Sequence, residues 1–208
     1  MNSRAGRRPL TARAHAEVAA RLLPGALVVD ATAGNGHDTR FLAEAVGASG
    51  RVWAFDVQIP ALEATQRRLK AAGVAQRVSL IHAGHETLAA HLPPGVRGRL
   101  GAVMFNLGYL PGGDHARITR PDTTLAALET ALEWLHPRGL ISLMVYRGHP
   151  GGEAEYAAVR AWIGDTPAAR CLTRESPGPG APVLLLLERG DAPGEPPSGG
   201  GMMPPGDA

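Results

Sequence analysis

A short apolar strand, a glycine turn and a helix follow one another near the start of the chain, and this order limits the fold more than any other feature. Residues 27–29 are apolar, end at the acid Asp30 and lead into small residues that include Gly34 and Gly36. A helical pattern with an apolar face then covers residues 41–46. Glycine lets the backbone adopt positive φ and approach a ligand, and helix N–H groups point into the gap. The pattern is typical of a nucleotide-binding α/β unit.

A second acid follows the next predicted strand. Residues 51–55 form that strand and end at Asp56, about 20 residues beyond the turn, where nucleotide-binding folds carry a ribose-binding acid. A carboxylate there accepts hydrogen bonds from two ribose hydroxyls and repels a phosphate, so we expect a ligand with an unmodified ribose. The alternative is a solvated acid beside the helix that Pro60 opens.

Strands and helices alternate along the rest of the chain. Further strands are predicted at residues 78–81, 102–105, 140–145, 169–173 and 183–187. Helices are predicted at residues 11–22, with Thr11 as the cap, and at 61–72, 88–91, 121–135 and 153–163, with Pro137 and Gly139 closing the fourth. This alternation predicts an α/β fold with a mainly parallel, doubly wound sheet that ends in a hairpin. Ligands of such sheets bind at the carboxyl ends of the strands, so the loops there converge on one crevice.

The composition is that of one domain without a membrane span. We expect the basic residues 1–10 and the Gly- and Pro-rich residues 190–208 to be disordered, which leaves a single domain over residues 11–189. No apolar run is long enough for a bilayer, no secretory signal is visible, and Cys171 is the single cysteine, so we expect a cytoplasmic protein. The net charge is only +2, and nearly all bases are Arg. An RNA footprint and a GC-rich coding bias explain these arginines equally well.

The loop after the fourth predicted strand carries an amine-binding pattern. Its residues Asn106-Leu107-Gly108-Tyr109 resemble the Asn/Asp-x-x-Tyr/Phe motif of amino-group methyltransferases. An amide oxygen and a nearby carbonyl accept the N–H bonds of an amine, which aims its lone pair at a methyl donor, and the ring favours a cationic transition state. The alternative is an ordinary loop. With seven strands and a final hairpin, the chain resembles Rossmann-like class I methyltransferases, which have helices on both faces of the sheet.

Five segments together resemble the MnmM (YtqB) family: DATAGNGHDT, AFDVQ, HAGHE, FNLGYLPGGDH and YRGHPGG. The resemblance spans residues 11–188. It implies methylation of the 5-aminomethyl group of 2-thiouridine at the wobble position of tRNA, with S-adenosylmethionine as donor and the anticodon region as partner. Thr32 replaces the first glycine of the usual class I turn, so we expect the turn to differ there.

Site residues follow as hypotheses. The expected cofactor-binding residues are Asp30, Gly34, Asn35, Gly36, Asp38, Asp56, Gln58, His85 and Glu86. Asn106 and Tyr109 are expected to orient the amine. An alkyl ammonium has a pKa of about 10 and must lose a proton before attack, unless the site binds the neutral amine. The candidate proton acceptors are Asp114, His115, Tyr146 and His149.

The same residues admit other interpretations. Several histidines suggest a metal, but no His-Glu-x-x-His helix or matching carboxylate spacing accompanies them, so we expect none. An rRNA or small-molecule amine methyltransferase would use the same residues. A nicotinamide-dependent dehydrogenase is suggested only by the first strand–helix unit and Asp56. A non-catalytic RNA-binding domain would leave Asp56 and Asn106 without a role. A homodimer is left open.

Overall fold

Seven strands form one sheet in the order β3-β2-β1-β4-β5-β7-β6 in the computed structural model, which describes residues 9–108, 118–178 and 180–190. The strands are β1 Leu27–Asp30, β2 Arg51–Asp56, β3 Val78–His82, β4 Leu100–Leu107, β5 Leu135–Val145, β6 Ala169–Glu175 and β7 Val183–Arg189. Strands β1 to β5 are parallel, and β7 is antiparallel to β5 and β6. The predicted Rossmann-like sheet and its terminal hairpin are therefore confirmed.

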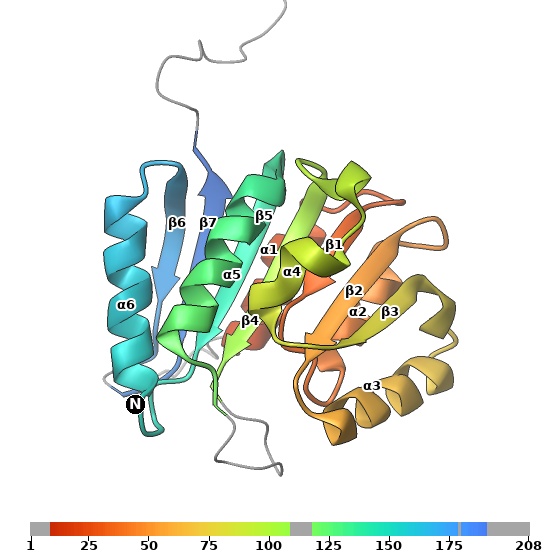
Figure 1. Cartoon of the computed structure of the whole chain (residues 1–208), viewed down its shortest axis with the longest axis horizontal. Helices are drawn as coiled ribbons and strands as arrows, with labels where there is room; N and C mark the ends of the chain where they lie inside the picture. Colours follow the sequence, from red (N-terminus) through yellow and green to blue (C-terminus); the bar gives the residue numbers. More distant parts are fainter. Residues whose placement is uncertain (1–8, 109–117, 179, 191–208) are drawn as a thin grey trace, which may run out of the picture.

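Helices cover both faces of this sheet. They are α1 Leu10–Ala19, α2 His37–Ala45, α3 Ile59–Ala71, α4 Leu88–His91, α5 Pro121–Trp134 and α6 Gly152–Asp165, with short 3₁₀ turns η1 Ala75–Arg77, η2 His85–Thr87 and η3 Pro94–Val96. In Figure 1, α4, α5 and α6 lie in front of the sheet and α1 and α2 lie behind it. Within the described ranges, no helix is long and apolar enough to cross a membrane.

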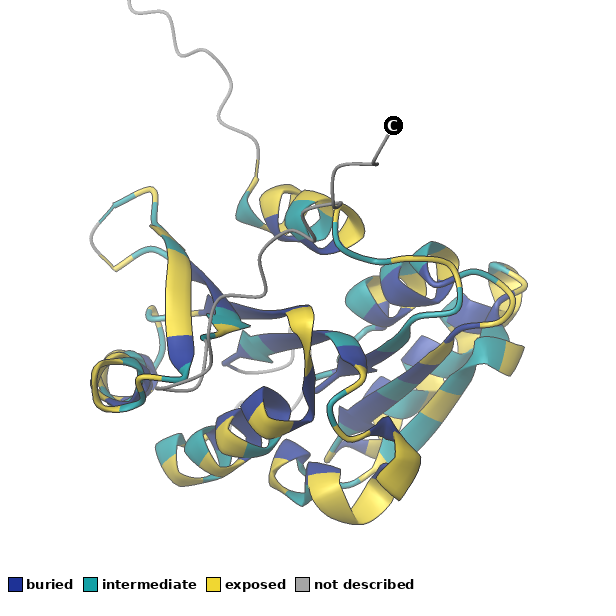
Figure 2. Ribbon diagram, turned by 90° about the horizontal axis from the view of Figure 1, so that it is seen from above, coloured by how far each residue is buried: buried dark blue, intermediate teal, exposed yellow. Residues whose placement is uncertain are grey.

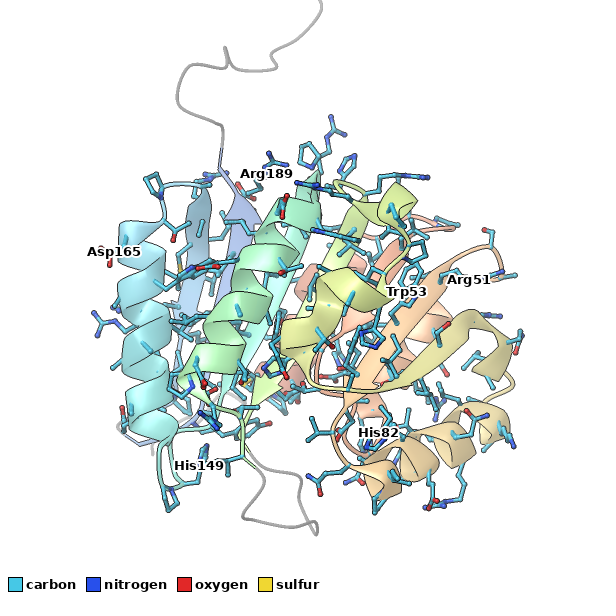
Figure 3. The ribbon with its side chains drawn as sticks, in the orientation of Figure 1. Arg51, Trp53, His82, His149, Asp165 and Arg189 are labelled. Atoms are coloured by element: carbon cyan, nitrogen blue, oxygen red, sulfur yellow. The ribbon has the colours of Figure 1, made fainter. Side chains whose placement is uncertain are left out.

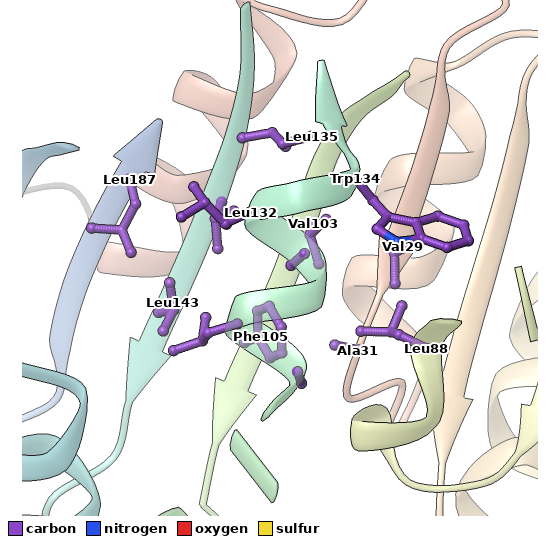
Figure 4. Packing of buried hydrophobic residues seen from close by; sticks show 14 of the residues in the cluster. Val29, Ala31, Leu88, Val103, Phe105, Leu132, Trp134, Leu135, Leu143 and Leu187 are labelled. Atoms are coloured by element: carbon purple, nitrogen blue, oxygen red, sulfur yellow. The ribbon is translucent and has the colours of Figure 1, made fainter. Parts of the chain in front are cut away.

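The core consists of two apolar layers, one on each face of the sheet. Along β4, Val103, Phe105 and Leu107 belong to the layer under α4, α5 and α6, whereas Ala102 and Met104 belong to the layer under α1, α2 and α3. Successive side chains of a strand point to opposite faces, so a central parallel strand must be apolar on both. Figure 4 shows the first layer, and Figure 2 shows the buried central strands beside the exposed edge strand β6.

Strands β4 and β5 are longer than the sequence predicted. Asn106 was expected in a loop, but β4 continues to Leu107, and Asn106 pairs with Met144 of β5. The helix that Pro137 and Gly139 were expected to close does end before them, at Trp134, but β5 begins at Leu135 rather than Leu140, so Pro137 lies within the strand. The register of β4 and β5 shifts there, between Leu100 and Ala102. At such an irregularity a proline removes no regular ladder bond.

Two predicted helix starts also differ from the structure. Thr11 was expected to cap the first helix, but α1 already begins at Leu10 and Pro9 is its N-cap. The helix after the second strand begins at Ile59 rather than Ala61. Disorder was predicted for residues 1–10 and 190–208; residues 1–8 and 191–208 lie outside the described residues, whereas Leu10 already belongs to α1.

Candidate active site

The glycine turn packs directly against α3. Gly34 has φ 52° and Gly36 has φ 77°, and a Cβ added to Gly36 would lie 2.7 Å from the hydroxyl oxygen of Thr65. That hydroxyl donates to the carbonyl of Gly34 (3.0 Å), and Arg68 Nε donates to the carbonyl of Asn35 (2.7 Å). Positive φ and this close approach both favour glycine. Two side chains of α3, neither singled out from the sequence, therefore hold the turn.

Asp56 links the end of β2 to the same turn. Its Oδ2 accepts the backbone N–H of Gly34 (2.8 Å), and its Oδ1 accepts that of Gln58 (2.8 Å). A carboxylate has about four lone-pair sites, so each oxygen can still accept from a ligand. Val57 and Ile59 flank Asp56 in sequence and are 45% and 54% exposed. The sequence predicted the carboxylate as a ligand-binding group but not the two exposed apolar side chains beside it.

Asp30 lies beneath the turn and is fully buried. Its Oδ1 accepts the backbone N–H of Thr32 (3.1 Å), and its Oδ2 accepts the hydroxyl of Thr39 in α2 (2.6 Å). Burial, together with the nearby charge of Asp38, raises the pKa of Asp30 from 3.8 to about 7. Asp30 therefore ties the turn to α2.

Replacing Asp30 with Asn should remove a pH-dependent part of the stability. Because folding raises the pKa of Asp30 from 3.8 to about 7, its protonated form favours the folded state, and that contribution is lost as the pH rises through this window. The unfolding free energy of Asp30→Asn, minus that of the wild type, should therefore increase between pH 4 and pH 7 by on the order of a few kcal/mol. Urea unfolding across this range measures the difference. A difference independent of pH, as expected for the exposed Asp165→Asn control, would contradict it.

Asp38 joins three elements of the site. Its Oδ1 lies 2.6 Å from His15 Nε2 of α1, and its Oδ2 accepts the side-chain N–H of Asn106 from β4 (2.6 Å). The His15 ring stacks on Phe41, with ring centroids 3.9 Å apart and planes within 4°. Burial alone would raise the pKa of Asp38, but the hydrogen bonds from His15 and Asn106 outweigh it and lower that pKa. Asp38 is therefore a carboxylate, and His15 is a site residue that sequence reasoning missed.

Thr32 connects the glycine turn to the end of β4. Its hydroxyl accepts the backbone N–H of Asn106 (2.7 Å). The sequence showed Thr32 only as a departure from the class I turn. That departure was the one sign that this position has a role of its own. The hydroxyl does what a glycine could not, because it ties Asn106 to the turn.

Tyr146 and His149 face the end of β4 from the segment after β5. The backbone N–H of Tyr146 donates to the carbonyl of Leu107 (2.9 Å), and a Cβ added to Gly108 would lie 3.3 Å from Tyr146 Cβ and 3.6 Å from His149 Nε2. Burial and the charge of Asp38 raise the pKa of Tyr146, so its phenol is protonated at neutral pH. Figure 3 shows His149 at the same edge of the sheet as His82, opposite Arg189 and Asp165. Tyr109, Asp114 and His115 lie outside the described residues.

His85 and Glu86 lie in η2, after β3. His85 is buried, its Nδ1 lies 3.3 Å from the carbonyl of Ala31, and its ring packs edge-on against Phe105. Burial lowers the pKa of His85, so the ring is neutral. Its Nε2 is buried with no hydrogen-bond partner among the described residues. Glu86 is exposed. In the described part of the chain, no group of three or more His, Cys, Asp or Glu is arranged to hold a metal ion.

The predicted site residues of β1, β2 and β4 are thus joined through one turn. Relatives of the chain agree with this architecture. A family model described as "Putative rRNA methylase" matches residues 52–174. The chloroplastic tRNA (mnm(5)s(2)U34)-methyltransferase of Arabidopsis thaliana is 40% identical over 193 residues, which are 88% of this chain and 70% of that protein. The chain belongs to the MnmM (YtqB) methyltransferase family.

Two solved structures are similar to this MnmM-family chain in both sequence and fold. A protein of Clostridium thermocellum with the same description as the family model superposes with a TM-score of 0.82 and is 35% identical, with 88% of this chain and 99% of that chain covered. A protein of Streptococcus mutans, solved in complex with SAH, has a TM-score of 0.76 and 33% identity over 88% of this chain and 99% of that chain.

Proposed function

We propose that this protein transfers the methyl group of S-adenosylmethionine to the 5-aminomethyl group of 2-thiouridine at the wobble position of tRNA. The proposal rests on hydrogen bonds that join Asp56 and Asn106 to the same glycine turn. The Asp56 carboxylate accepts the backbone N–H of Gly34 (2.8 Å), and the backbone N–H of Asn106 donates to the hydroxyl of Thr32 (2.7 Å). A donor-binding acid and an amine-binding amide therefore share one edge of the sheet. The name of the Arabidopsis relative supports the choice of substrate, and the SAH complex of the Streptococcus mutans protein supports the choice of donor.

The residues around Asp56 fit S-adenosylmethionine. The Asp56 carboxylate would hold the ribose hydroxyls, and the exposed apolar side chains of Val57 and Ile59 would lie against the adenine. Gln58, His85 and Glu86 stay candidates on the adenosine side. Asn35 and Asp38 would meet the methionine end, while Asp30 acts through the turn. When bound, S-adenosylmethionine supplies a methyl group on a positively charged sulfur.

The amine would be oriented by Asn106. Its Nδ2 donates to Asp38, so its carbonyl oxygen can accept an N–H of the substrate and aim the nitrogen lone pair. The amine nitrogen gains a bond to the methyl carbon, that carbon loses its bond to sulfur, and the nitrogen releases a proton. Tyr146 is protonated at neutral pH, so we assign it to orienting and shielding the amine. Asp114, His115 and His149 remain the candidate proton acceptors.

A methyl-transfer assay with defined tRNA tests the function. The protein is incubated with isotope-labelled S-adenosylmethionine and with tRNA that carries 5-aminomethyl-2-thiouridine, and the tRNA is then digested to nucleosides. We expect one labelled methyl group on that nucleoside. Label on rRNA, or on free alkyl amines alone, would replace this substrate by the alternative class. Absence of any transfer, with S-adenosylhomocysteine bound normally, would overturn the proposal.

A basic groove between α2 and α3 is suited to the RNA backbone. It is lined by His37, Arg40, Arg67 and Arg68 and has a volume of about 490 Å³. Arg68 also holds the glycine turn, whereas Arg40 and Arg67 point their charges toward solvent-exposed glutamates. Arginine suits phosphate recognition because its planar guanidinium forms paired hydrogen bonds. We assign this groove to phosphates of the bound tRNA.

Reversing a charge in the groove should weaken the binding of tRNAs of different sequence by the same factor. Arg67→Glu is expected to reduce affinity several-fold at low salt and to reduce the slope of log affinity against log salt by about 1. A filter-binding titration at several salt concentrations measures both quantities. Arg189→Glu, at the opposite edge of the sheet, serves as the matched control. Equal losses in the two variants would argue against the groove.

Two further expectations belong to this proposal. We propose that the protein works in the cytoplasm, as expected from its composition, although the Arabidopsis relative is named as chloroplastic. A homodimer stays a prediction, and light scattering at working concentration tests it.

A further inference from the structure

A hydrogen-bond network of three side chains, His15, Asp38 and Asn106, connects α1 to the residue assigned to the substrate amine. His15 of α1 contacts Asp38 at 2.6 Å, and Asp38 accepts from the amide of Asn106 at 2.6 Å. The His15 and Asp38 side chains are 30% and 13% exposed, so water competes little for the bonds at Asp38. Helix α1 precedes the first strand and supplies none of the residues predicted to bind the donor or the amine. Its polar contact with the site therefore needs a separate explanation.

The face of β4 explains why these residues meet. Side chains two positions apart lie on the same face of a strand, so Asn106 shares a face with Met104 and Ala102. Both of those residues pack in the layer under α1 and α2. Asn106 is therefore directed toward His15 and Asp38 and away from α5. Because Asn106 pairs with Met144 in the regular ladder of β4 and β5, the pleat of the sheet fixes the side to which its side chain points.

The carboxylate of Asp38 sets the direction of both hydrogen bonds in this network of three side chains. A carboxylate only accepts, so both the His15 Nε2 and the Asn106 Nδ2 must donate to it. The tautomer of His15 and the orientation of the Asn106 amide follow from this requirement. Nδ2 of Asn106 faces Asp38, so its Oδ1 faces away from Asp38. That oxygen is the atom an amine N–H would meet.

We propose that His15 is a positioning residue for methyl transfer: by donating to Asp38 it holds the carboxylate that keeps the Asn106 oxygen aimed at the substrate amine. This inference rests on the proposed function. Stacking on Phe41 holds the imidazole in plane, so its N–H points at Asp38 without further ordering. Without that donor, Asp38 can rotate, and the amide of Asn106 can rotate with it.

Two variants separate positioning from packing at His15. His15→Gln keeps an N–H donor near the position of Nε2 but removes the ring, whereas His15→Phe keeps a flat ring on Phe41 but removes the donor. We expect His15→Phe to lower kcat about 10- to 100-fold, the size of effect that a small misplacement of a reacting group causes. KM for S-adenosylmethionine should rise less than kcat falls, because Asp38 is one of several assigned donor contacts and Asp56 is untouched, and His15→Gln should retain most of the activity. A packing role predicts the reverse order, and that order would overturn the inference.

A double-mutant cycle and an NMR measurement complete the test. In an Asp38→Asn background, His15→Phe should cause little further loss, because the two residues act through one contact. Hydrogen exchange of the Asn106 side-chain amide, assigned with Asn106→Ala, should be slow in the wild type and His15→Gln and faster in His15→Phe. Additive losses, or equal exchange in all three proteins, would refute the positioning role. If the wild type fails to methylate tRNA but shows this exchange pattern, the proposed substrate fails and the His15 contact stands.

Discussion

Asn106→Ala is expected to lower kcat for tRNA methylation about 100- to 1,000-fold, the loss seen when one preorganised polar group of an active site is removed. The amide oxygen of Asn106 would orient the nitrogen lone pair, and an alanine offers no acceptor at the end of β4. The affinity for S-adenosylhomocysteine should change little, because Asp56 and the glycine turn are untouched. Single-turnover methylation and calorimetry measure the two effects separately.

The same position should also reject aspartate. Amino-group methyltransferases carry either Asn or Asp in this motif, but here the Asn106 amide lies 2.6 Å from Asp38. Two carboxylates at that distance must share a proton, because like charges disfavour ionisation of both. We expect Asn106→Asp to be nearly as inactive as Asn106→Ala. Gln76→Ala, which removes an exposed amide that bonds only within its own turn, is the matched control. Wild-type turnover in Asn106→Asp would show that Asp38 does not constrain the amide.

Asp56→Ala should weaken binding of S-adenosylhomocysteine about 10- to 100-fold or more, because a hydrogen bond to a charged group contributes about 1.5–3 kcal/mol. The variant loses the acceptor for both ribose hydroxyls and also releases the backbone N–H groups of Gly34 and Gln58. Calorimetric titration of the purified proteins measures the change in affinity.

The control for Asp56 is Asp165→Ala, an exposed acid at the end of α6, on the opposite edge of the sheet. It should bind S-adenosylhomocysteine as the wild type does. Thermal unfolding of both variants separates loss of a ligand contact from loss of the fold. Unchanged affinity in a folded Asp56→Ala protein would remove the assigned role of this carboxylate.

Much of the fold was predictable because its signals are local. The apolar run before Asp30, the two glycines and the helix after them lie within about 20 residues, and such a unit has few ways to fold. The same holds for the final hairpin between β6 and β7. The start of β5 was predicted too late, at Leu140, because Pro137 and Gly139 suggest a break locally. Pairing of Leu135 with Leu100, which is 35 residues away, instead draws this segment into β5.

The amino-acid order alone specified the strand–turn–helix unit, the acids at the ends of β1 and β2, and the motif that carries Asn106. Only the folded chain decided how these groups act on one another. His15 and Asp38 are 23 residues apart, and Asp38 and Asn106 are 68 apart, so no local pattern reports their contact. The side of the sheet that Asn106 faces depends on the pleat of β4, and a shift of one residue would reverse it. The direction of a single amide oxygen is therefore a tertiary property, although its residue type is written in the sequence.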